Sequence, residues 1–322
     1  MQPSAPSMPP ALARYQAILD EGLRAALPVD GSDLVAAARY VMGWDADDGA
    51  RSQSAGKRIR PSLCLFAAET LGGTIAEALP GAVAIELVHN FSLVHDEIQD
   101  RDAERHHRPT TWARLGEAQA INVGDYLYTR AIHALTVDGG NAERRLRALQ
   151  ILHSAIAEMI AGQWQDIAFE GRARIAEEDY IQMVAAKTGA LLAAPLEIGA
   201  TLAGTERALA AAISSWGLQV GLAFQIWDDY LGAWGDPDVT GKPAGSDIRR
   251  KKKTFPVVVA MRDGRAAEVL SSVFAMEEVD DAAASDALRA LEESGARERT
   301  RVAAEGYASA AAVLLGDIPI DA

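Results

Sequence analysis

Apolar residues recur along most of the chain at the spacing of an α-helix. In Ala11–Leu27 they are mostly three or four apart, which places them on one helical face: Leu12, Tyr15, Ile18, Leu19, Leu23 and Leu27. The same spacing predicts helices near 33–42, 79–100, 117–135, 142–169, 177–203 and 205–231. We find no convincing run of alternating apolar and polar residues, so the pattern predicts an all-α protein.

Three stretches interrupt the helical pattern. Residues 43–56 and 232–253 are polar and rich in Gly, Asp or Ser, which is typical of long loops. Thr254–Val259 is rich in β-branched residues but contains Pro256. It is either a short strand or the start of a buried helix, and we favour the helix.

The composition is that of a globular protein with an acidic surface. Of the 322 residues 49% are apolar, and 31 Lys and Arg against 45 Asp and Glu give a formal charge of -14. This balance argues against general nucleic-acid binding, which needs a basic surface. Since the composition does not shift along the chain, we expect a single all-helical domain over residues 11–322, after a flexible N-terminus over 1–10.

The sequence favours a soluble, cytoplasmic protein. Cys64 is the only cysteine, so no internal disulfide can form, which fits a reducing compartment. The first ten residues, MQPSAPSMPP, lack the basic and apolar regions of a signal peptide. No uninterrupted apolar run approaches the roughly 18 residues of a membrane span. We therefore expect no membrane span.

Two acidic segments each follow a long apolar helix. In HDEIQD, Asp96 and Asp100 are four residues apart and share one helical face. Like charges at that spacing repel, and carboxylates at a helix C-terminus oppose the helix dipole, unless a cation joins them. In FQIWDDYL, Asp228 and Asp229 are adjacent. The alternative is a solvated helix end, but two such segments suggest facing walls of a cavity that binds Mg²⁺ and substrate phosphates.

Basic residues at separate places would complete a cage for such phosphates. Lys57 and Arg60, in GKRIRP, are three residues apart and would share a helical face. Lys187 lies within an apolar helix, where an unpaired lysine is costly. The remaining candidates are Arg105, Arg108, Lys242 and Lys252.

Together these motifs resemble those of the trans-prenyltransferases of the polyprenyl synthetase family. The resemblance runs from Lys57 to Pro256 over ordered motifs: GKRIRP, HNFSLVHDEIQD, RPTTW, GDYLYTRA, GQWQD, KTG, FQIWDDYLG and TGKPAGSDIRRKKKTFP. It implies an all-α bundle around a deep active-site cavity, usually a homodimer. The activity it implies is that of an Mg²⁺-dependent isoprenyl diphosphate synthase, which joins isopentenyl diphosphate to an allylic diphosphate of five to fifteen carbons.

The resemblance also implies roles for individual residues. Three Mg²⁺ ions would have Asp96, Asp100 and Asp228 as main ligands, with Asp229 acting behind them. The allylic diphosphate would be held by Arg105, Lys187 and Lys242, with Thr188 and Gln225 nearby. Isopentenyl diphosphate would be held by Lys57, Arg60 and His89, and the position of His106 normally contacts it as well. Lys252 is a further substrate-binding candidate.

Four positions depart from the family pattern. Glu97 stands where the first acidic motif has its second aspartate, and Gly232 where the second motif has its third. His106 replaces the second arginine of an Arg-Arg pair. Lys251 replaces a glycine before Lys252.

These departures leave two alternatives open. A terpene cyclase on the same fold would ionise an allylic diphosphate without an acceptor, and Lys57, Arg60 and His89 argue against it because a cyclase has little reason to keep an acceptor site. A non-catalytic subunit of a heteromeric synthase typically loses an acidic motif outright, whereas here both motifs keep their leading aspartates. An isoprenyl diphosphate synthase is therefore the preferred interpretation.

Product length is expected to depend on the helix before Asp96. Phe91 lies five residues earlier, roughly 7.5 Å along a helix, and Ser92 is small. In the family, an aromatic residue at this place resembles enzymes that make C20 products, with C15 as the near alternative. We therefore expect geranylgeranyl diphosphate, with Phe91 and Ser92 forming the floor of the pocket.

Overall fold

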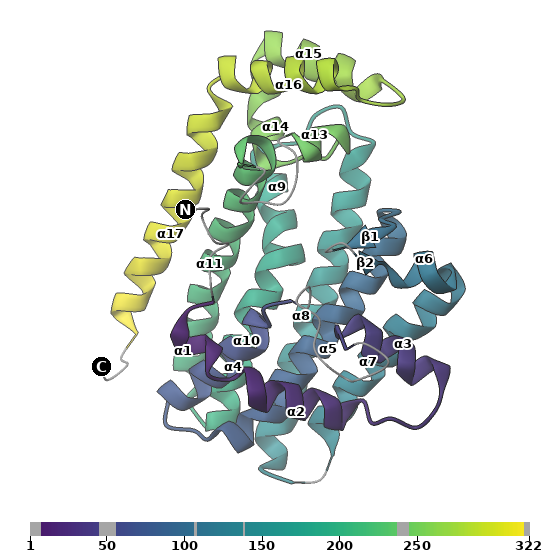
Figure 1. Ribbon diagram of the computed structural model, residues 1–322. Helices are drawn as coiled ribbons and strands as arrows, with labels where there is room; N and C mark the ends of the chain where they lie inside the picture. The colour runs from purple at the N-terminus through teal and green to yellow at the C-terminus, as the bar shows by residue number, and fades with distance from the viewer. Residues whose placement is uncertain (1–7, 45–55, 106–107, 138, 237–244, 319–322) are drawn as a thin grey trace, which may run out of the picture. The chain divides into compact units, whose positions relative to one another are not determined.

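The described part of the chain is almost entirely helical. The computed structural model describes residues 8–44, 56–105, 108–137, 139–236 and 245–318 (Figure 1). Within these residues the only strands are β1 (Glu104–Arg105) and β2 (Arg108–Pro109), which pair antiparallel. The all-α prediction is confirmed.

The chain divides into two compact units, which are described separately. The N-terminal unit comprises Met8–Ser154 and Ala194–Ala211, and the C-terminal unit comprises Ala155–Ala193 and Ala212–Pro319, with the few terminal residues outside the described part. Three long helices begin in one unit and end in the other: α8 (Ala142–Glu170), α10 (Ala190–Ala203) and α11 (Arg207–Trp234).

Each of the remaining helices lies within one unit. In the N-terminal unit they are α1 (Pro10–Ala13), α2 (Gln16–Ala26), α3 (Asp33–Val41), α4 (Ile59–Thr70), α5 (Ile75–Gln99), α6 (Thr111–Leu115) and α7 (Glu117–Thr136). In the C-terminal unit they are α9 (Glu177–Val184), the π-helical turn η1 (Ala185–Gly189), α13 (Ser246–Arg249), α14 (Phe255–Ala260), α15 (Gly264–Ala275), α16 (Asp281–Glu293) and α17 (Ala296–Asp317).

The predicted helices agree with the structure except at their ends. The stretch 11–27 forms two helices, because a turn at Arg14 and Tyr15 separates α1 from α2. Both acidic segments lie on their helices, as predicted: α5 runs to Gln99, against a predicted end at 100, and α11 runs to Trp234, against a predicted end at 231. In α5 the N–H of Asp100 still bonds to the carbonyl of Asp96 at 2.8 Å, so the acidic side chains project from a continuous helix.

Parts of three other predictions lie outside the described residues. They are the flexible N-terminus over residues 1–7, most of the loop 43–56, and the centre of the stretch 232–253. The described flanks of that last stretch are helical, because α11 ends at Trp234 and α13 begins at Ser246.

Helix α5 lies at the centre of the N-terminal core. It begins with a capping box, in which Thr74 and Glu77 satisfy backbone N–H groups of the first turn. Ile85, Leu87 and Val88 are completely buried, and the helix packs against α4 and α7. Because α5 is buried on several faces, the residues near its C-terminal end are carried on a rigid support.

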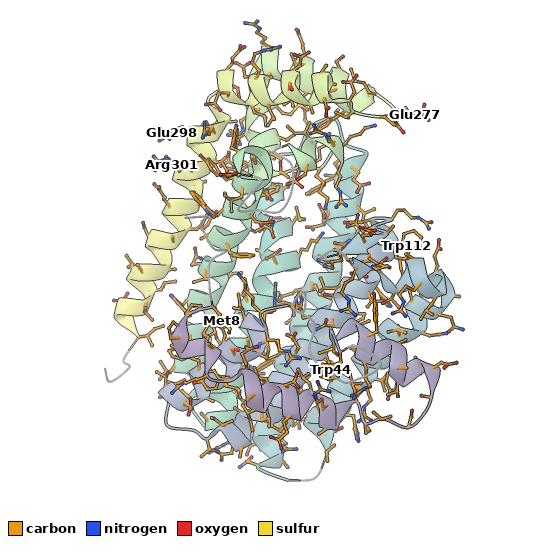
Figure 2. The ribbon with its side chains drawn as sticks, viewed as in Figure 1. Met8, Trp44, Trp112, Glu277, Glu298 and Arg301 are labelled. Atoms are coloured by element: carbon orange, nitrogen blue, oxygen red, sulfur yellow. The ribbon has the colours of Figure 1, made fainter. Side chains whose placement is uncertain are left out.

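A buried tryptophan, Trp44, follows α3 and packs against α2 in the N-terminal unit. Trp44, labelled in Figure 2, is 2% exposed. Its indole N–H donates to Oδ1 of Asp20 on α2 at 3.0 Å. The guanidinium groups of Arg24 and Arg39 lie over the indole ring at 4.5 and 4.9 Å. The cluster fixes the end of α3 against α2.

The C-terminal core is built around the short helix α14. Phe255, Val257, Val258 and Val259 are all buried there, and α14 packs against α9, α16 and α17. Pro256 lies in the first turn, where its missing N–H costs no hydrogen bond. The preference for a helix at Thr254–Val259 is therefore confirmed.

Two helical stretches of the described chain have the length and composition of a membrane span. They are Glu177–Ala203 and Arg207–Trp234, and 72% and 33% of their span-length windows are buried. Core helices of globular proteins meet the same criteria, so these stretches carry no argument for a membrane.

Candidate active site

In the first acidic segment, Asp96 and Asp100 are partly exposed, whereas Glu97 is buried. Asp96 and Asp100, at the end of α5, are both half-buried. Glu97 is 7% exposed, and its Oε1 lies 3.4 Å from Nη1 of Arg105. Burial raises the pKa of Glu97, and the charge of Arg105 opposes that rise. Glu97 therefore supports Arg105 rather than extending the pair formed by Asp96 and Asp100.

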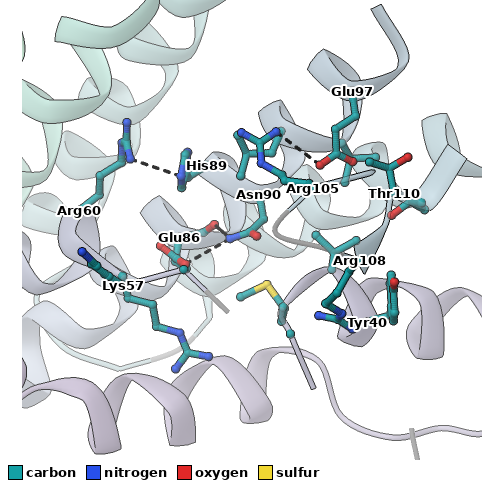
Figure 3. A pocket seen from close by; sticks show the side chains of 18 of the residues that line it. Tyr40, Lys57, Arg60, Glu86, His89, Asn90, Glu97, Arg105, Arg108 and Thr110 are labelled. Atoms are coloured by element: carbon teal, nitrogen blue, oxygen red, sulfur yellow. Dashed lines mark hydrogen bonds and ion pairs between the residues drawn. The ribbon is translucent and has the colours of Figure 1, made fainter. Parts of the chain in front are cut away.

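A cationic cavity of about 240 Å³ borders the same helix (Figure 3). Its lining includes four predicted substrate-binding residues: Lys57, Arg60, His89 and Arg105. Nη1 of Arg60 lies 3.3 Å from Nε2 of His89. Burial, together with the charges of Arg60 and Arg105, keeps the pKa of His89 well below its usual value. The imidazole is therefore neutral, and Nε2 can accept a hydrogen bond from Arg60.

The prediction that Lys57 and Arg60 share a helical face is wrong. Helix α4 begins at Ile59, so Lys57 lies in the turn before it. Between them Arg58 adopts a left-handed backbone with φ 52° and ψ 41°, a conformation that sequence spacing does not reveal. Lys57 and Arg60 nevertheless line the same cavity.

A strand pair carries two arginines of the cavity. Arg105 lies on β1 and Arg108 on β2. Tyr40 of α3 holds this hairpin: the guanidinium of Arg108 lies 4.1 Å from the centre of its ring, and its hydroxyl donates to the carbonyl of Pro109 at 2.8 Å. His106, between the strands, lies outside the described residues.

Asp228 and Asp229 are adjacent on α11 but lie in different environments. Asp228 is exposed, whereas Asp229 is 6% exposed. The carboxylate of Asp229 accepts hydrogen bonds from the hydroxyl of Tyr180, the N–H of Phe255 (2.7 Å) and Nε2 of Gln225 (3.1 Å). Burial raises the pKa of Asp229 to about 7, against the opposing effect of these hydrogen bonds. Asp229 thus joins α9, α11 and the start of α14.

Lys187 lies in η1, a type of helix distortion frequent at functional sites. Its Nζ donates to Oδ2 of Asp166 on α8 at 2.5 Å. Gly162, one turn before Asp166, lies so close to η1 that a Cβ would overlap the backbone N of Lys187. On the next residue, Oγ1 of Thr188 donates to Oε1 of Gln225 at 3.0 Å. The motifs GQWQD and KTG are therefore packed directly against each other.

A cavity of about 90 Å³ in the C-terminal unit joins these groups. It is lined by five of the predicted site residues, Lys187, Thr188, Gln225, Asp229 and Lys252, together with Asp166, Tyr180, Met183, Val184, Lys253 and Thr254. Lys242 lies outside the described residues.

The structure explains two of the departures from the family pattern. Lys251 has φ 55°, the left-handed region that glycine enters most easily, and its Nζ bonds to the carbonyls of Met276 and Glu277. At Gly232 a Cβ would overlap the carboxylate of Asp247 on α13. A side chain at 232 therefore has no room while Asp247 holds this position.

The two residues expected to limit product length lie on α5. Phe91 is 8% exposed, and its ring centre is 5.0 Å from that of His95 and 5.6 Å from that of Tyr128 on α7. Ser92 is half-buried, and its hydroxyl donates to the carbonyl of His89 at 2.8 Å. Phe91 is thus part of an aromatic cluster rather than an isolated ring.

The sequence interpretation missed several residues that hold the site together. Tyr180 and Tyr40 fall within predicted helices, and no motif singles them out. Asp20 belongs to a helix with no recognised motif. What distinguishes these residues is a contact partner far away in the sequence, and the spacing of apolar residues does not predict such a partner.

The donor set fits Mg²⁺ better than a metal that needs a full protein cage. Among the described residues, no group of three or more His, Cys, Asp or Glu side chains is placed to hold a metal ion. Mg²⁺ is commonly bound by one or two carboxylates together with water and substrate phosphates. Asp96 and Asp100 of the N-terminal unit are donors of that kind, and Asp228 of the C-terminal unit is another, each considered by itself.

Comparisons with known proteins agree on one family. A polyprenyl synthetase family model matches residues 50–291. The chain is 43% identical over 249 residues to a (2E,6E)-farnesyl diphosphate synthase of Mycobacterium bovis, covering 77% of this chain and 68% of that one. It is 36% identical over 295 residues to a geranylgeranyl diphosphate synthase of Methanosarcina mazei, covering 92% and 86%.

The fold leads to the same family. A crystal structure of a polyprenyl synthetase from Streptomyces coelicolor superposes with a TM-score of 0.88 and 38% identity, covering 97% of this chain and 94% of that one. The matched residues 50–291 include both acidic segments, the whole lining of the second cavity and the lining of the first except Tyr40, Val41, Met42 and Gly43. The chain therefore belongs to the polyprenyl synthetase family.

Proposed function

We propose that this isoprenyl diphosphate synthase condenses isopentenyl diphosphate with allylic diphosphates and releases a C20 product. The observation that carries the proposal is the cationic cavity of the N-terminal unit. Lys57, Arg60, His89 and Arg105 gather there in a chain whose formal charge is -14. A diphosphate is the kind of ligand that such a cluster attracts.

The acceptor diphosphate would bind in this cavity. Lys57 and Arg60 offer charged donors, and the neutral His89 orients the guanidinium of Arg60. Glu97 holds Arg105 through their ion pair. His106 is proposed to contribute as well, from a position outside the described residues.

The allylic diphosphate is assigned to Lys187, Thr188, Gln225 and Lys252 of the second cavity. The resemblance to the family assigns Arg105 and Lys242 to the same ligand. Asp166 fixes the ammonium of Lys187, and Asp229 fixes the segment that follows Lys252 through the N–H of Phe255. Fixed cations aimed at the departing diphosphate stabilise the charge that develops on it. We assign Mg²⁺ to Asp96, Asp100 and Asp228, where, when bound, it would supply Lewis-acid stabilisation of that same charge.

The chemistry then needs no side-chain base. The C–O bond to the allylic diphosphate breaks, its electron pair leaves with the diphosphate, and an allylic cation remains. The double bond of isopentenyl diphosphate forms the new C–C bond, and the proton lost from the adduct passes to the released diphosphate. Exclusion of water from the closed site would protect the cation from premature capture.

An incubation series tests the function. Purified protein and Mg²⁺ are given labelled isopentenyl diphosphate with a C5, C10, C15 or C20 allylic diphosphate, and the dephosphorylated products are sized by mass spectrometry. The expected result is an all-trans series that ends at C20. A hydrocarbon or cyclic alcohol formed without consumption of isopentenyl diphosphate would instead indicate a terpene cyclase, and no turnover of any primer would indicate a partner subunit.

Phe91→Ala should lengthen the product beyond C20. Removing the ring opens space next to Tyr128 and His95, into which a longer chain can extend. The opposite change, Ser92→Phe, should shorten it. Chromatography of the products measures both, and Phe91→Leu serves as a milder variant because Phe→Ala in a core costs about 3–5 kcal/mol. Unchanged chain length in all three variants would assign the floor to other residues.

We also propose that the enzyme is a homodimer in which α8 forms part of the interface. Ile160, Trp164 and Ile167 follow one another at helical spacing on α8 and are 53%, 77% and 43% exposed. Exposed aromatic side chains of this kind are typical interface anchors. Trp164→Glu should therefore convert the dimer to monomers in sedimentation analysis, with Val313→Glu on α17, also an exposed position, as the control. A dimer that survives Trp164→Glu would rule out this interface.

A further inference from the structure

Arg58 combines burial, charge and an unfavourable backbone at the edge of the cationic cavity. It is 4% exposed, and its φ of 52° lies in the left-handed region. Residues other than glycine seldom adopt this conformation, and it persists where the surroundings enforce it. The residues on either side of this turn, Lys57 and Arg60, line the cavity proposed for the acceptor diphosphate.

The side chain of Arg58 is held by α2. Nη1 of Arg58 lies 2.8 Å from Oδ1 of Asp20. Asp20 also binds Nε of Arg24 at 2.6 Å and accepts from the indole N–H of Trp44 at 3.0 Å. Burial opposes ionisation, but the bonds from Arg24, Trp44 and Arg58 prevail and lower the pKa of Asp20 to about 2. Asp20 is therefore a fixed anion facing a buried cation.

The backbone of the same turn is held from the previous turn of α2. Nε2 of Gln16 donates to the carbonyl of Lys57 at 3.2 Å and to Oγ of Ser62 at 3.3 Å. Oγ of Ser62 donates in turn to the carbonyl of Arg58 at 2.8 Å. Gln16 and Asp20 are four residues apart, so one face of α2 grips both the backbone and the side chain of the turn.

We infer that Gln16 and Asp20 form a clamp, acting through Arg58, that positions Lys57 and Arg60 for the diphosphate of the acceptor. Asp20, Gln16 and Arg58 are positioning residues in this account, since the groups offered to the substrate are those of Lys57 and Arg60. The inference rests on the proposed function, because it assumes that the acceptor binds in this cavity.

The clamp should matter for acceptor affinity more than for the chemical step. Without the anion, Arg58 must either leave its buried place or remain there with its charge uncompensated, and the left-handed turn loses its support. A displacement of about 1 Å in a binding group can cost up to about 10²-fold. We expect a rise of about tenfold in the KM for isopentenyl diphosphate.

Steady-state kinetics of Asp20→Asn test the clamp. The expected result is a tenfold higher KM for isopentenyl diphosphate, with kcat and the KM for farnesyl diphosphate within about twofold of wild type. The matched control is Glu21→Gln, the neighbouring exposed carboxylate on α2, which should change none of these values. Gln16→Ala, a milder variant that removes the bonds to the carbonyl of Lys57 and to Oγ of Ser62, should raise the same KM about threefold.

A double-variant cycle shows whether Asp20 acts through Arg58. In Arg58→Gly the backbone keeps access to the left-handed region but the cation is gone. Adding Asp20→Asn to this background should not raise the KM for isopentenyl diphosphate further.

Three results would overturn the inference. The first is a KM for isopentenyl diphosphate that is unchanged in both Asp20→Asn and Gln16→Ala. The second is a change of all kinetic constants by the same factor in a variant whose Tm has fallen. The third is a double variant in which the effects of Asp20→Asn and Arg58→Gly on this KM simply add. A wild-type enzyme that never consumes isopentenyl diphosphate would refute the proposed function instead, so the two failures are distinguishable.

Discussion

Asp228→Asn should lower kcat by about 10³-fold and leave Tm within about 2 °C of wild type. Asp228 is exposed on α11, so an amide in its place remains solvated and the fold loses little. Its carboxylate is one of three assigned to Mg²⁺, and a neutral amide is a poor ligand for that ion. Loss of one preorganised electrostatic contact to the departing group typically costs 10²- to 10³-fold.

The neighbouring change, Asp229→Asn, should have a different signature. Asp229 is buried and accepts from Tyr180, Gln225 and the N–H of Phe255. An asparagine amide must turn its NH₂ group towards one of these donors, which costs about 1–3 kcal/mol in a buried site. We therefore expect Tm to fall by several degrees, together with a loss of activity as the segment after Lys252 shifts.

Two measurements separate the paired variants. Thermal unfolding followed by circular dichroism gives Tm, and calorimetry of Mg²⁺ with inorganic pyrophosphate gives metal-dependent ligand binding without turnover. For Asp228→Asn we expect weaker binding of Mg²⁺ and pyrophosphate at an unchanged Tm. The control is Asp236→Asn, because Asp236 is an exposed aspartate just beyond α11. Equal losses of Tm in the Asp228 and Asp229 variants would contradict this division of roles.

The different environments of Asp228 and Asp229 show what a sequence pattern cannot predict. The spacing of apolar residues was enough to predict the helices, because burial of one face imposes a period on the chain. It places the C-terminal end of α5 within one residue of the observed end, and that of α11 three residues too early. Two adjacent aspartates, one buried and one exposed, have the same appearance in a sequence.

The sequence motifs predict which residues belong to the candidate site, but not how these residues are arranged in space. The motifs identified Lys57, Arg60, His89 and Arg105, and the structure places them around one cavity. They did not reveal the left-handed turn at Arg58, because local spacing assumes a continuous helix.

The supporting contacts could not be predicted for a related reason. The bond from Tyr180 to Asp229 spans 49 residues, and that from Trp44 to Asp20 spans 24. Such pairs depend on how helices pack, and no local pattern records them. The packing of α8 against η1 depends likewise on the absence of a side chain at Gly162.

Gly232→Asp should restore the family's acidic motif and yet damage the protein. A Cβ at this position overlaps the carboxylate of Asp247, and a second carboxylate would add repulsion between like charges. Overpacking of this kind costs about 1–3 kcal/mol, so we expect Tm to fall by about 5 °C. Because α13, which carries Asp247, lies just before Lys252, activity should fall rather than rise.

Removing the obstructing side chain supplies the decisive test. In Gly232→Asp/Asp247→Ala the overlap and the repulsion both disappear, so Tm should recover most of its loss, which independent effects at the two sites would not produce. Gly306→Asp is the matched control, since a Cβ at this helical glycine of α17 meets nothing within 4 Å. A Gly232→Asp enzyme that is as stable as wild type and more active would show instead that Asp247 moves aside readily. Gly232 would then be a simple loss of a carboxylate rather than an adaptation to Asp247.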